Sequence, residues 1–420
     1  MRPDGRKKLM PEAARVVIEH LRSGVPSPEV AEALSTARER LIAVLEADME
    51  RVADGRATRN HQVMTANYGD GKSHVLNALW LRARRRRWLV SMVTFSREAP
   101  LDQTERVYRK VAARTYMPGV ERPGLGPLLD ALAERPEVTQ RLLREVERNL
   151  HPKVALALAA RLEGRGDPVT VDEERHGYRH SVSDIRRAYQ ERTGKRPPKV
   201  ERYLVGEHAF DYFRLVDAMV RALELPGWLL LFDEVEMIGN LGRMGRARSY
   251  AFMGRMTDPK TLPSTYSVWM VSSNFRPRVI EQLEEPARLP AWLTERGREP
   301  LAQEVVRPLD DLVRAQGLPP LTSEDLREMF GAIVEVHAAA LHWQPPLDGI
   351  ALLDRIRAQV PERDAKVRQL VRGAVQYLDL MQQYGKEPRI RLHSVGEAPI
   401  TPEDDELPAG TAVVRDWPDD

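Results

Sequence analysis

The sequence predicts an α/β fold built on a parallel sheet, because short apolar segments alternate with helical patterns. Residues 88–95 are rich in β-branched and aromatic residues, residues 227–232 form the most apolar run in the chain, and residues 267–273 form a third such segment. A fourth extended stretch, residues 62–65, leads through a glycine-bearing turn into a helix. Strands that alternate with helices pair in parallel and are buried on both faces. We therefore expect a central parallel sheet covered by helices.

Residues 1–60 are predicted to form a helical N-terminal segment. Apolar residues spaced three and four apart, such as Val17 and Leu21, indicate a first helix. Gly24 and Pro26 interrupt this pattern before a second helix begins.

Four further divisions follow from changes in pattern along the chain. Residues 61–310 hold all the predicted strands and form the core, with a mainly helical insertion at about 121–205. After Pro319–Pro320 the pattern is purely helical, so residues 311–400 are predicted to form a C-terminal helical lid. Residues 401–420 contain seven acids and one arginine and are predicted to be a disordered tail.

Composition excludes several classes of protein. The 420 residues are 42% apolar and 30% charged, which fits a globular chain of two or three domains. No run approaches the roughly 18 apolar residues of a membrane span, and the first residues lack the apolar centre of a signal peptide, so we expect a cytoplasmic location. The absence of cysteine excludes disulfides and thiolate sites, and the ten histidines show no zinc-motif spacing.

Residues 66–73 carry most of the pattern of a phosphate-binding loop. Such a loop needs small residues whose amides turn toward phosphates, a following helix N-terminus, a lysine for the β- and γ-phosphates, and a hydroxyl for Mg²⁺. The usual pattern begins with glycine, where this chain has Ala66. The alternative interpretation is a glycine turn that precedes a Lys-Ser pair by chance. The residues assigned to the nucleotide are Asn67, Tyr68, Gly69, Asp70, Gly71, Lys72, Ser73 and His74.

An acid pair follows the apolar strand at residues 229–232. Asp233 is predicted to hold Mg²⁺ together with Ser73, and Glu234 to polarise the attacking water. Glu236 could substitute in either role. A chance pair of acids at a strand end is the alternative. Together with Lys72, the pair predicts hydrolysis of a nucleoside triphosphate.

Three basic groups could contact nucleic acid. The densest contains Arg82 and the run of arginines at 84–87, although cations at this end of a helix also offset its dipole. The others lie at residues 243–248 and 276–278, where they could face DNA or a neighbouring subunit's nucleotide. The net charge of only +2 adds little support for a polyanionic partner.

Four segments together resemble the ATP-binding proteins of bacteriophage-exclusion (BREX) defence systems. They are residues 16–27, 67–74, 96–101 and 232–236. This P-loop family is similar to the origin-recognition branch of AAA+ ATPases, so the resemblance implies an AAA+-type core. It also implies ATP as the nucleotide, a prokaryotic cytoplasmic setting, and work beside a methyltransferase, a helicase or other defence proteins.

Two further residues are assigned to the site. In AAA-type ATPases a polar residue after the strand beside the acidic one reads the γ-phosphate, which points to Asn274, with Ser273 second. In the lid, Arg363, Arg368 and Arg372 could each place a cation against the nucleotide, and Arg368 is assigned to it. The alternative is that these arginines belong to a solvated helix surface.

The sequence therefore supports two alternative hypotheses for the function. The first is an AAA+ ATPase that hydrolyses ATP, as a single chain or as a homo-oligomer, to drive assembly on DNA or on a DNA-processing partner. Glu234, Lys72 and Asn274 have the catalytic roles in this hypothesis. The alternative is a non-hydrolysing scaffold or sensor in which bound ATP fixes the angle between core and lid.

Overall fold

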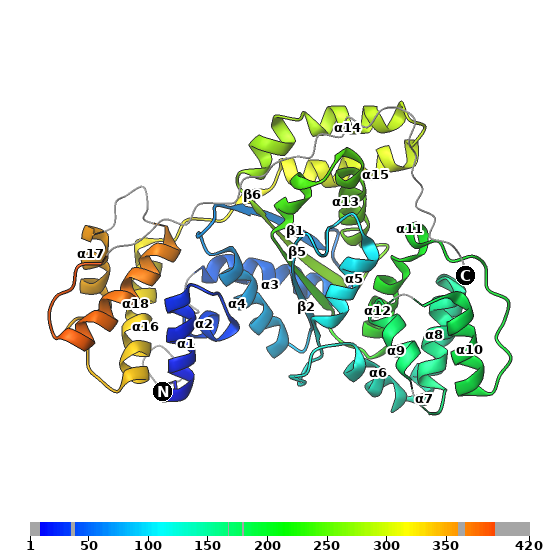
Figure 1. Cartoon of the computed structure of the whole chain (residues 1–420), viewed down its shortest axis with the longest axis horizontal. Coiled ribbons are helices and arrows are strands. Elements are labelled where there is room, and N and C mark those ends of the chain that lie inside the picture. The colour runs from blue at the N-terminus through cyan, green and yellow to red at the C-terminus, as the bar shows by residue number, and fades with distance from the viewer. Residues whose placement is uncertain (1–8, 35–37, 167, 179, 360–365, 391–420) are drawn as a thin grey trace.

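A computed structural model describes most of the chain (Figure 1). The described residues are 9–34, 38–166, 168–178, 180–359 and 366–390. The predicted acidic tail and the candidate Arg363 lie outside them. No described helix is both long and apolar enough to cross a bilayer.

A six-stranded sheet forms the centre of the molecule, which confirms the α/β class. Its strands are β1 (His61–Ala66), β2 (Leu89–Thr94), β3 (Thr115–Tyr116), β4 (Trp228–Asp233), β5 (Thr265–Ser272) and β6 (Gln316–Gly317). Their spatial order is β3-β2-β4-β5-β1-β6, and every neighbouring pair is parallel except β2 with β3. The carboxyl ends of β1, β5 and β4 therefore meet at one edge, where open parallel sheets bind ligands.

Helices cover both faces of this sheet, because alternate residues of each strand point to opposite sides. Leu229 and Leu231 of β4 pack with α3 and α4, whereas Leu230 and Phe232 pack with the opposite layer. The first layer consists of α3 (Glu39–Ala53) and α4 (Lys72–Arg85). The opposite layer includes α5 (Thr104–Ala113), α12 (Asp211–Ala222) and α13 (Arg243–Met256).

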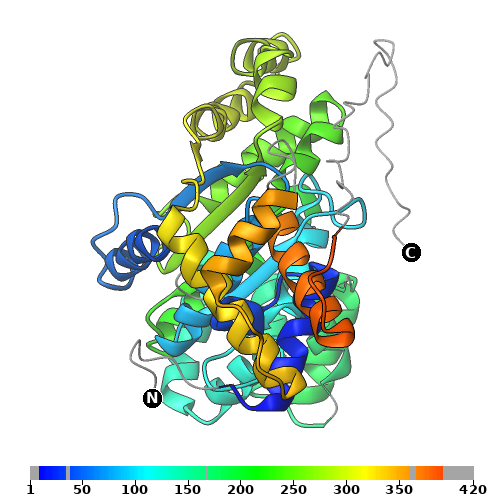
Figure 2. The ribbon, with the colours of Figure 1, turned by 90° about the vertical axis from the view of Figure 1, so that its left-hand side faces the viewer.

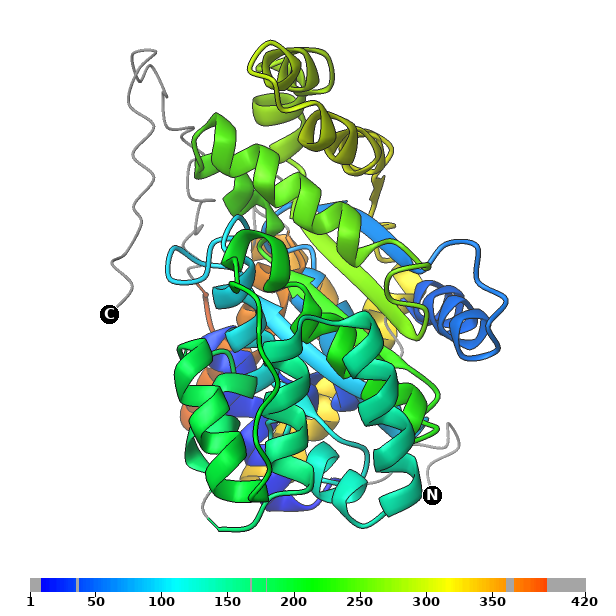
Figure 3. The same cartoon turned by 90° about the vertical axis from the view of Figure 1, so that its right-hand side faces the viewer.

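Two helical groups extend this core. Between β3 and α12 lie α6 (Gly126–Ala133), α7 (Pro136–Asn149), α8 (Pro152–Leu162), α9 (Val169–Arg175), α10 (Val182–Thr193) and α11 (Val205–His208), in front in Figure 3. The short helix η1 (Val235–Asn240) follows β4, and the short helix η2 (Arg276–Glu281) follows β5. Next come α14 (Glu285–Thr294) and α15 (Glu299–Val313), of which α15 packs on both α13 and α14.

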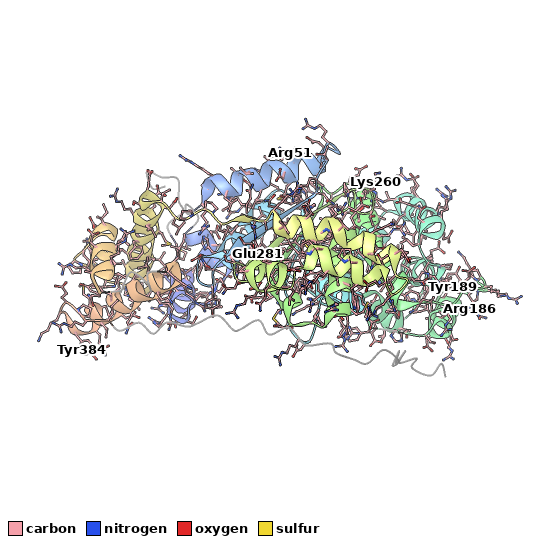
Figure 4. All side chains as sticks on the ribbon, turned by 90° about the horizontal axis from the view of Figure 1, so that it is seen from above. Arg51, Arg186, Tyr189, Lys260, Glu281 and Tyr384 are labelled. Carbon is pink, nitrogen blue, oxygen red and sulfur yellow. The ribbon has the colours of Figure 1, made fainter. Side chains whose placement is uncertain are left out.

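The N-terminal helices pack with the C-terminal helices rather than forming a separate core. One apolar cluster joins α1 (Pro11–Ser23) and α2 (Pro28–Ala33) to α16 (Ser323–Leu341), α17 (Gly349–Gln359) and α18 (Val367–Tyr384). Figure 2 shows α1 beside these helices. Arg22 of α1 donates two hydrogen bonds to Asp379 of α18, at 2.9 and 2.8 Å. We call this group the lid unit, and it lies at the opposite end of the molecule from α10, as Tyr384 and Arg186 mark in Figure 4.

Candidate functional site

The loop between β1 and α4 has the backbone that phosphate binding requires. Gly69 and Gly71 have φ angles of 89° and 94°, in the left-handed region that favours glycine. Gly71 is the residue before α4, so the first amides of that helix lie at the loop. The side chain of Asp70 accepts hydrogen bonds from the backbone N–H and the side-chain amide of Asn67, at 3.1 and 3.0 Å. These bonds hold the loop in a closed turn.

Lys72 is buried and faces an acid that sequence reasoning had treated only as a substitute. Its Nζ lies 3.6 Å from Oε1 of Glu236 and 3.4 Å from the carbonyl oxygen of Ala66. The other carboxylate oxygen of Glu236 accepts a 3.0 Å hydrogen bond from the backbone N–H of Ser272. Burial raises the pKa of Glu236, and the Lys72 charge opposes this shift. Glu236 therefore compensates the buried ammonium group and fixes its position.

The acid pair reaches the loop across 160 residues of sequence. Ser73 Oγ donates a 2.6 Å hydrogen bond to Oδ2 of Asp233, which is only 3% exposed at the end of β4. Glu234 follows with a left-handed φ of 59° and lines the cavity over the loop. The hydroxyl and the carboxylate fit Mg²⁺, which is usually held by one or two carboxylates together with substrate phosphates and water. Among the described residues, no three His, Asp or Glu side chains converge as a metal site by themselves.

A cavity extends from the loop into the space between the core and the lid unit. Its apolar wall is made by the N-terminal helices and by the C-terminal ones, and includes Leu21, Val30, Leu34, Met329, Val367 and Val371. A largely apolar wall beside a phosphate-binding loop suits a planar base attached to a phosphate chain. Sequence reasoning used the segment at 16–27 only for its family likeness and missed this role.

Arg368 lies against the loop from α18. Its backbone N–H donates a 3.1 Å hydrogen bond to the carbonyl oxygen of Gly69. Its guanidinium lies over the Tyr68 ring, 5.0 Å from the centroid, and contacts the Tyr68 hydroxyl. Arg372, one turn further along, also lines the cavity. The first turn of α18 thus connects the lid unit to the phosphate-binding loop.

Two other assigned residues occupy different positions relative to the cavity. His74 lines it, and burial together with the nearby Arg38 charge lowers the pKa of His74 to about 4, so this imidazole is neutral at pH 7. Asn274 donates a 3.3 Å hydrogen bond from its backbone N–H to Ser272 Oγ. It is not among the cavity-lining residues in the part of the chain that the structure describes. Its γ-phosphate role stays a prediction.

Most of the arginines considered for nucleic acid have protein partners. Arg82 pairs with Glu39 at 2.6 Å, Arg84 with Glu121 at 2.9 Å, Arg85 with Glu32 at 2.5 Å and Arg86 with Glu46 at 3.1 Å. In the second group Arg246 is buried and pairs with Glu285 at 2.9 Å, and in the third Arg276 pairs with Glu281 at 2.9 Å. Much of the charge in these groups is therefore compensated within the molecule.

Part of the chain matches a known protein family. The model of the family described as "BREX system ATP-binding protein BrxC/D" matches residues 9–210. The matched part includes the N-terminal helices and the phosphate-binding loop, and it ends before β4 and the acid pair. No curated protein matches the chain.

Proposed function

Residues 9–210 match the model of the BREX system ATP-binding protein family, and from this match we propose that the chain is an ATPase of the AAA+ type. The family supports ATP binding in phage defence. The observation that carries the further step to hydrolysis is the hydrogen bond between Ser73 and Asp233, with Glu234 beside it in the cavity wall. This contact joins the phosphate-binding loop to the acids that a hydrolytic site needs.

In the proposed reaction, water attacks the γ-phosphate in line with the departing ADP. Glu234 orients and polarises this water, and Lys72 neutralises charge that develops on the phosphate oxygens. Mg²⁺, held through Ser73 and Asp233, would supply further positive charge on the phosphates. Glu236 keeps Lys72 in place, and Asn274 is proposed to approach the γ-phosphate from the end of β5.

The test is the rate of phosphate release by the Glu234→Gln variant, because a glutamine cannot act as a base. We expect a loss of at least about 100-fold with ATP binding retained. Glu284→Gln is the matched control, because Glu284 is also a left-handed glutamate but is exposed and pairs with Arg288. An unchanged rate in Glu234→Gln would contradict the assignment.

We further propose that ATP drives assembly on DNA or on DNA-processing defence partners in the prokaryotic cytoplasm, as a homo-oligomer. A non-hydrolysing scaffold is the second candidate, favoured by the contacts of Arg368 with Tyr68 and Gly69, through which bound ATP could fix the lid unit against the core. Phosphate release measured with and without duplex DNA separates the two. The ATPase hydrolyses ATP in at least one condition, and the scaffold in neither.

A further inference from the structure

Four polar side-chain atoms in the cavity wall are buried without a hydrogen-bond partner among the described residues: Nδ1 of His20, Nη1 of Arg38, Nε2 of His74 and Nε of Arg368. The guanidinium of Arg368 lies over the Tyr68 ring, and Nδ1 of His20 lies 4.0 Å from Glu29. This leaves Arg38 and His74 as the pair whose atoms have no ion-pair or aromatic partner in the part of the chain that the structure describes. A buried polar atom without a partner costs stability, so such atoms are uncommon in folded proteins and point to a missing ligand or water. Both Arg38 and His74 line the cavity of the proposed nucleotide site.

Arg38 is held in place at an energetic cost. It is the residue before α3, has a left-handed φ of 67°, and is only 8% exposed. Its Nη2 donates a 2.7 Å hydrogen bond to the carbonyl oxygen of Asp70 in the phosphate-binding loop. Burial lowers the pKa of Arg38, although the charges of Asp70 and Asp325 oppose this shift. A strained backbone and a buried cation with a free donor are typical of a residue kept for binding.

The position of His74 indicates which end of a nucleotide Arg38 and His74 would contact. Ser73 faces Asp233, and the next residue of an α-helix is turned by about 100° around its axis. His74 therefore points to a different side of α4 from the acid pair, which is assigned to the γ-phosphate. The nucleoside lies at the opposite end of the phosphate chain. Leu34 and Val30 supply apolar surface to the same cavity, as a base requires.

We propose that Arg38 and His74 bind the edge of the adenine base and select ATP over GTP. This inference rests on the proposed nucleotide site. Adenine presents a ring nitrogen acceptor beside an amino donor on one edge, whereas guanine presents two acceptors there. Arg38 Nη1 donates to the ring nitrogen, and neutral His74, protonated at Nδ1, accepts from the amino group through Nε2. Guanine would place its carbonyl oxygen against the Nε2 lone pair.

Calorimetric titration with ATP, GTP and tripolyphosphate tests the proposal. Arg38→Lys keeps the charge but loses the fork of donors, so ATP binding should weaken about tenfold or more while tripolyphosphate binding stays unchanged. His74→Phe should weaken ATP to a similar extent without weakening GTP, and so remove the preference for ATP. Arg40→Lys, an exposed arginine two residues away, should bind all three ligands as the wild type does.

The outcomes separate this inference from the proposed function. Equal losses of ATP and tripolyphosphate in Arg38→Lys would overturn the base contact, since Arg38 would then act through its bond to the loop at Asp70. Unchanged ATP affinity in both variants would also overturn it. If the wild type bound none of the three ligands, the nucleotide site itself would be wrong. His74→Phe tests the proposal independently if Arg38→Lys fails to fold.

Discussion

At the residue scale, four buried charged residues lie beside the phosphate-binding loop. Lys72, Asp233, Glu236 and Arg38 are each less than a tenth exposed. Each has a partner within the site: Lys72 contacts Glu236, Asp233 accepts from Ser73, and Arg38 donates to the carbonyl oxygen of Asp70. Because an uncompensated buried charge costs several kcal/mol, about 3–5 when one partner of a pair is removed, such residues are retained where binding or catalysis needs them.

At the residue scale, His74 should make the free energy of unfolding depend on pH. Its pKa of about 4 in the folded chain is below the ordinary value of about 6.5, so the unfolded chain binds the extra proton between these pH values. The free energy of unfolding should therefore fall as the pH drops from about 6.5 to 4, by up to about 3 kcal/mol from this group. Urea unfolding across this range measures it.

The control for the pH dependence is His74→Phe, which keeps a ring of similar size but cannot be protonated. The carboxylates titrate in both proteins, so the difference between the two curves isolates His74. Parallel curves for wild type and variant would show that the imidazole is not held neutral by its surroundings.

At the scale of elements, ion pairs connect the end of α4 to α2 and α3. Glu46 of α3 is 6% exposed and faces both Arg82, at 3.6 Å, and Arg86, at 3.1 Å. Changing both arginines to glutamine should lower the free energy of unfolding by about 1–3 kcal/mol, because the buried carboxylate loses its cations. Urea unfolding tests this.

Arg87→Gln is the comparison for that double variant. Arg87 is exposed and has no ion pair among the described residues, so its substitution should stay within about 0.5 kcal/mol of the wild type. If substitution of Arg87 lowered the free energy of unfolding as much as substitution of Arg82 or Arg86, the arginines would form a solvated charged surface rather than a contact between helices.

The buried pair between α13 and α14 predicts a larger effect. Arg246 donates to Glu285 through Nε and Nη2, at 3.1 and 2.9 Å, and both side chains are at most 5% exposed. Arg246→Met should lower the free energy of unfolding by about 3–5 kcal/mol, because Glu285 keeps a buried and unpaired charge. Arg248→Met, at an exposed position of the same helix, should change it little. Similar losses in both variants would contradict this.

At the scale of the whole molecule, three parts of the chain meet around one cavity: the N-terminal helices, the edge of the sheet and the C-terminal helices. The bond between Arg22 and Asp379 spans 357 residues, and the contact of Arg368 with Tyr68 spans 300. A ligand in this cavity would touch both the core and the lid unit. Binding should therefore stabilise the packing between them, by a free energy that grows with the logarithm of ligand concentration over Kd.

The pattern of neighbouring residues predicted the main strands, the phosphate-binding loop and the acid pair. The four main strands and the loop lie where their apolar runs and glycines indicate, and the acid pair ends β4. Contacts between distant segments cannot be read from the pattern of neighbouring residues, so the pairing of Glu236 with Lys72, the burial of Arg38 beside the loop and the packing of α1 with the C-terminal helices were not predictable. The arginine run at 84–87 appeared available for nucleic acid because its glutamate partners lie on other elements.

Calorimetric titration of Lys72→Ala with Mg²⁺ and ATP tests the central claim most directly, because this side chain sits at the centre of the assigned phosphate site. The variant should lose ATP binding while remaining folded. Lys195→Ala, an exposed lysine that pairs with Glu163 in the helical insertion, should bind like the wild type. ATP binding by Lys72→Ala with wild-type affinity would contradict the assignment of the site.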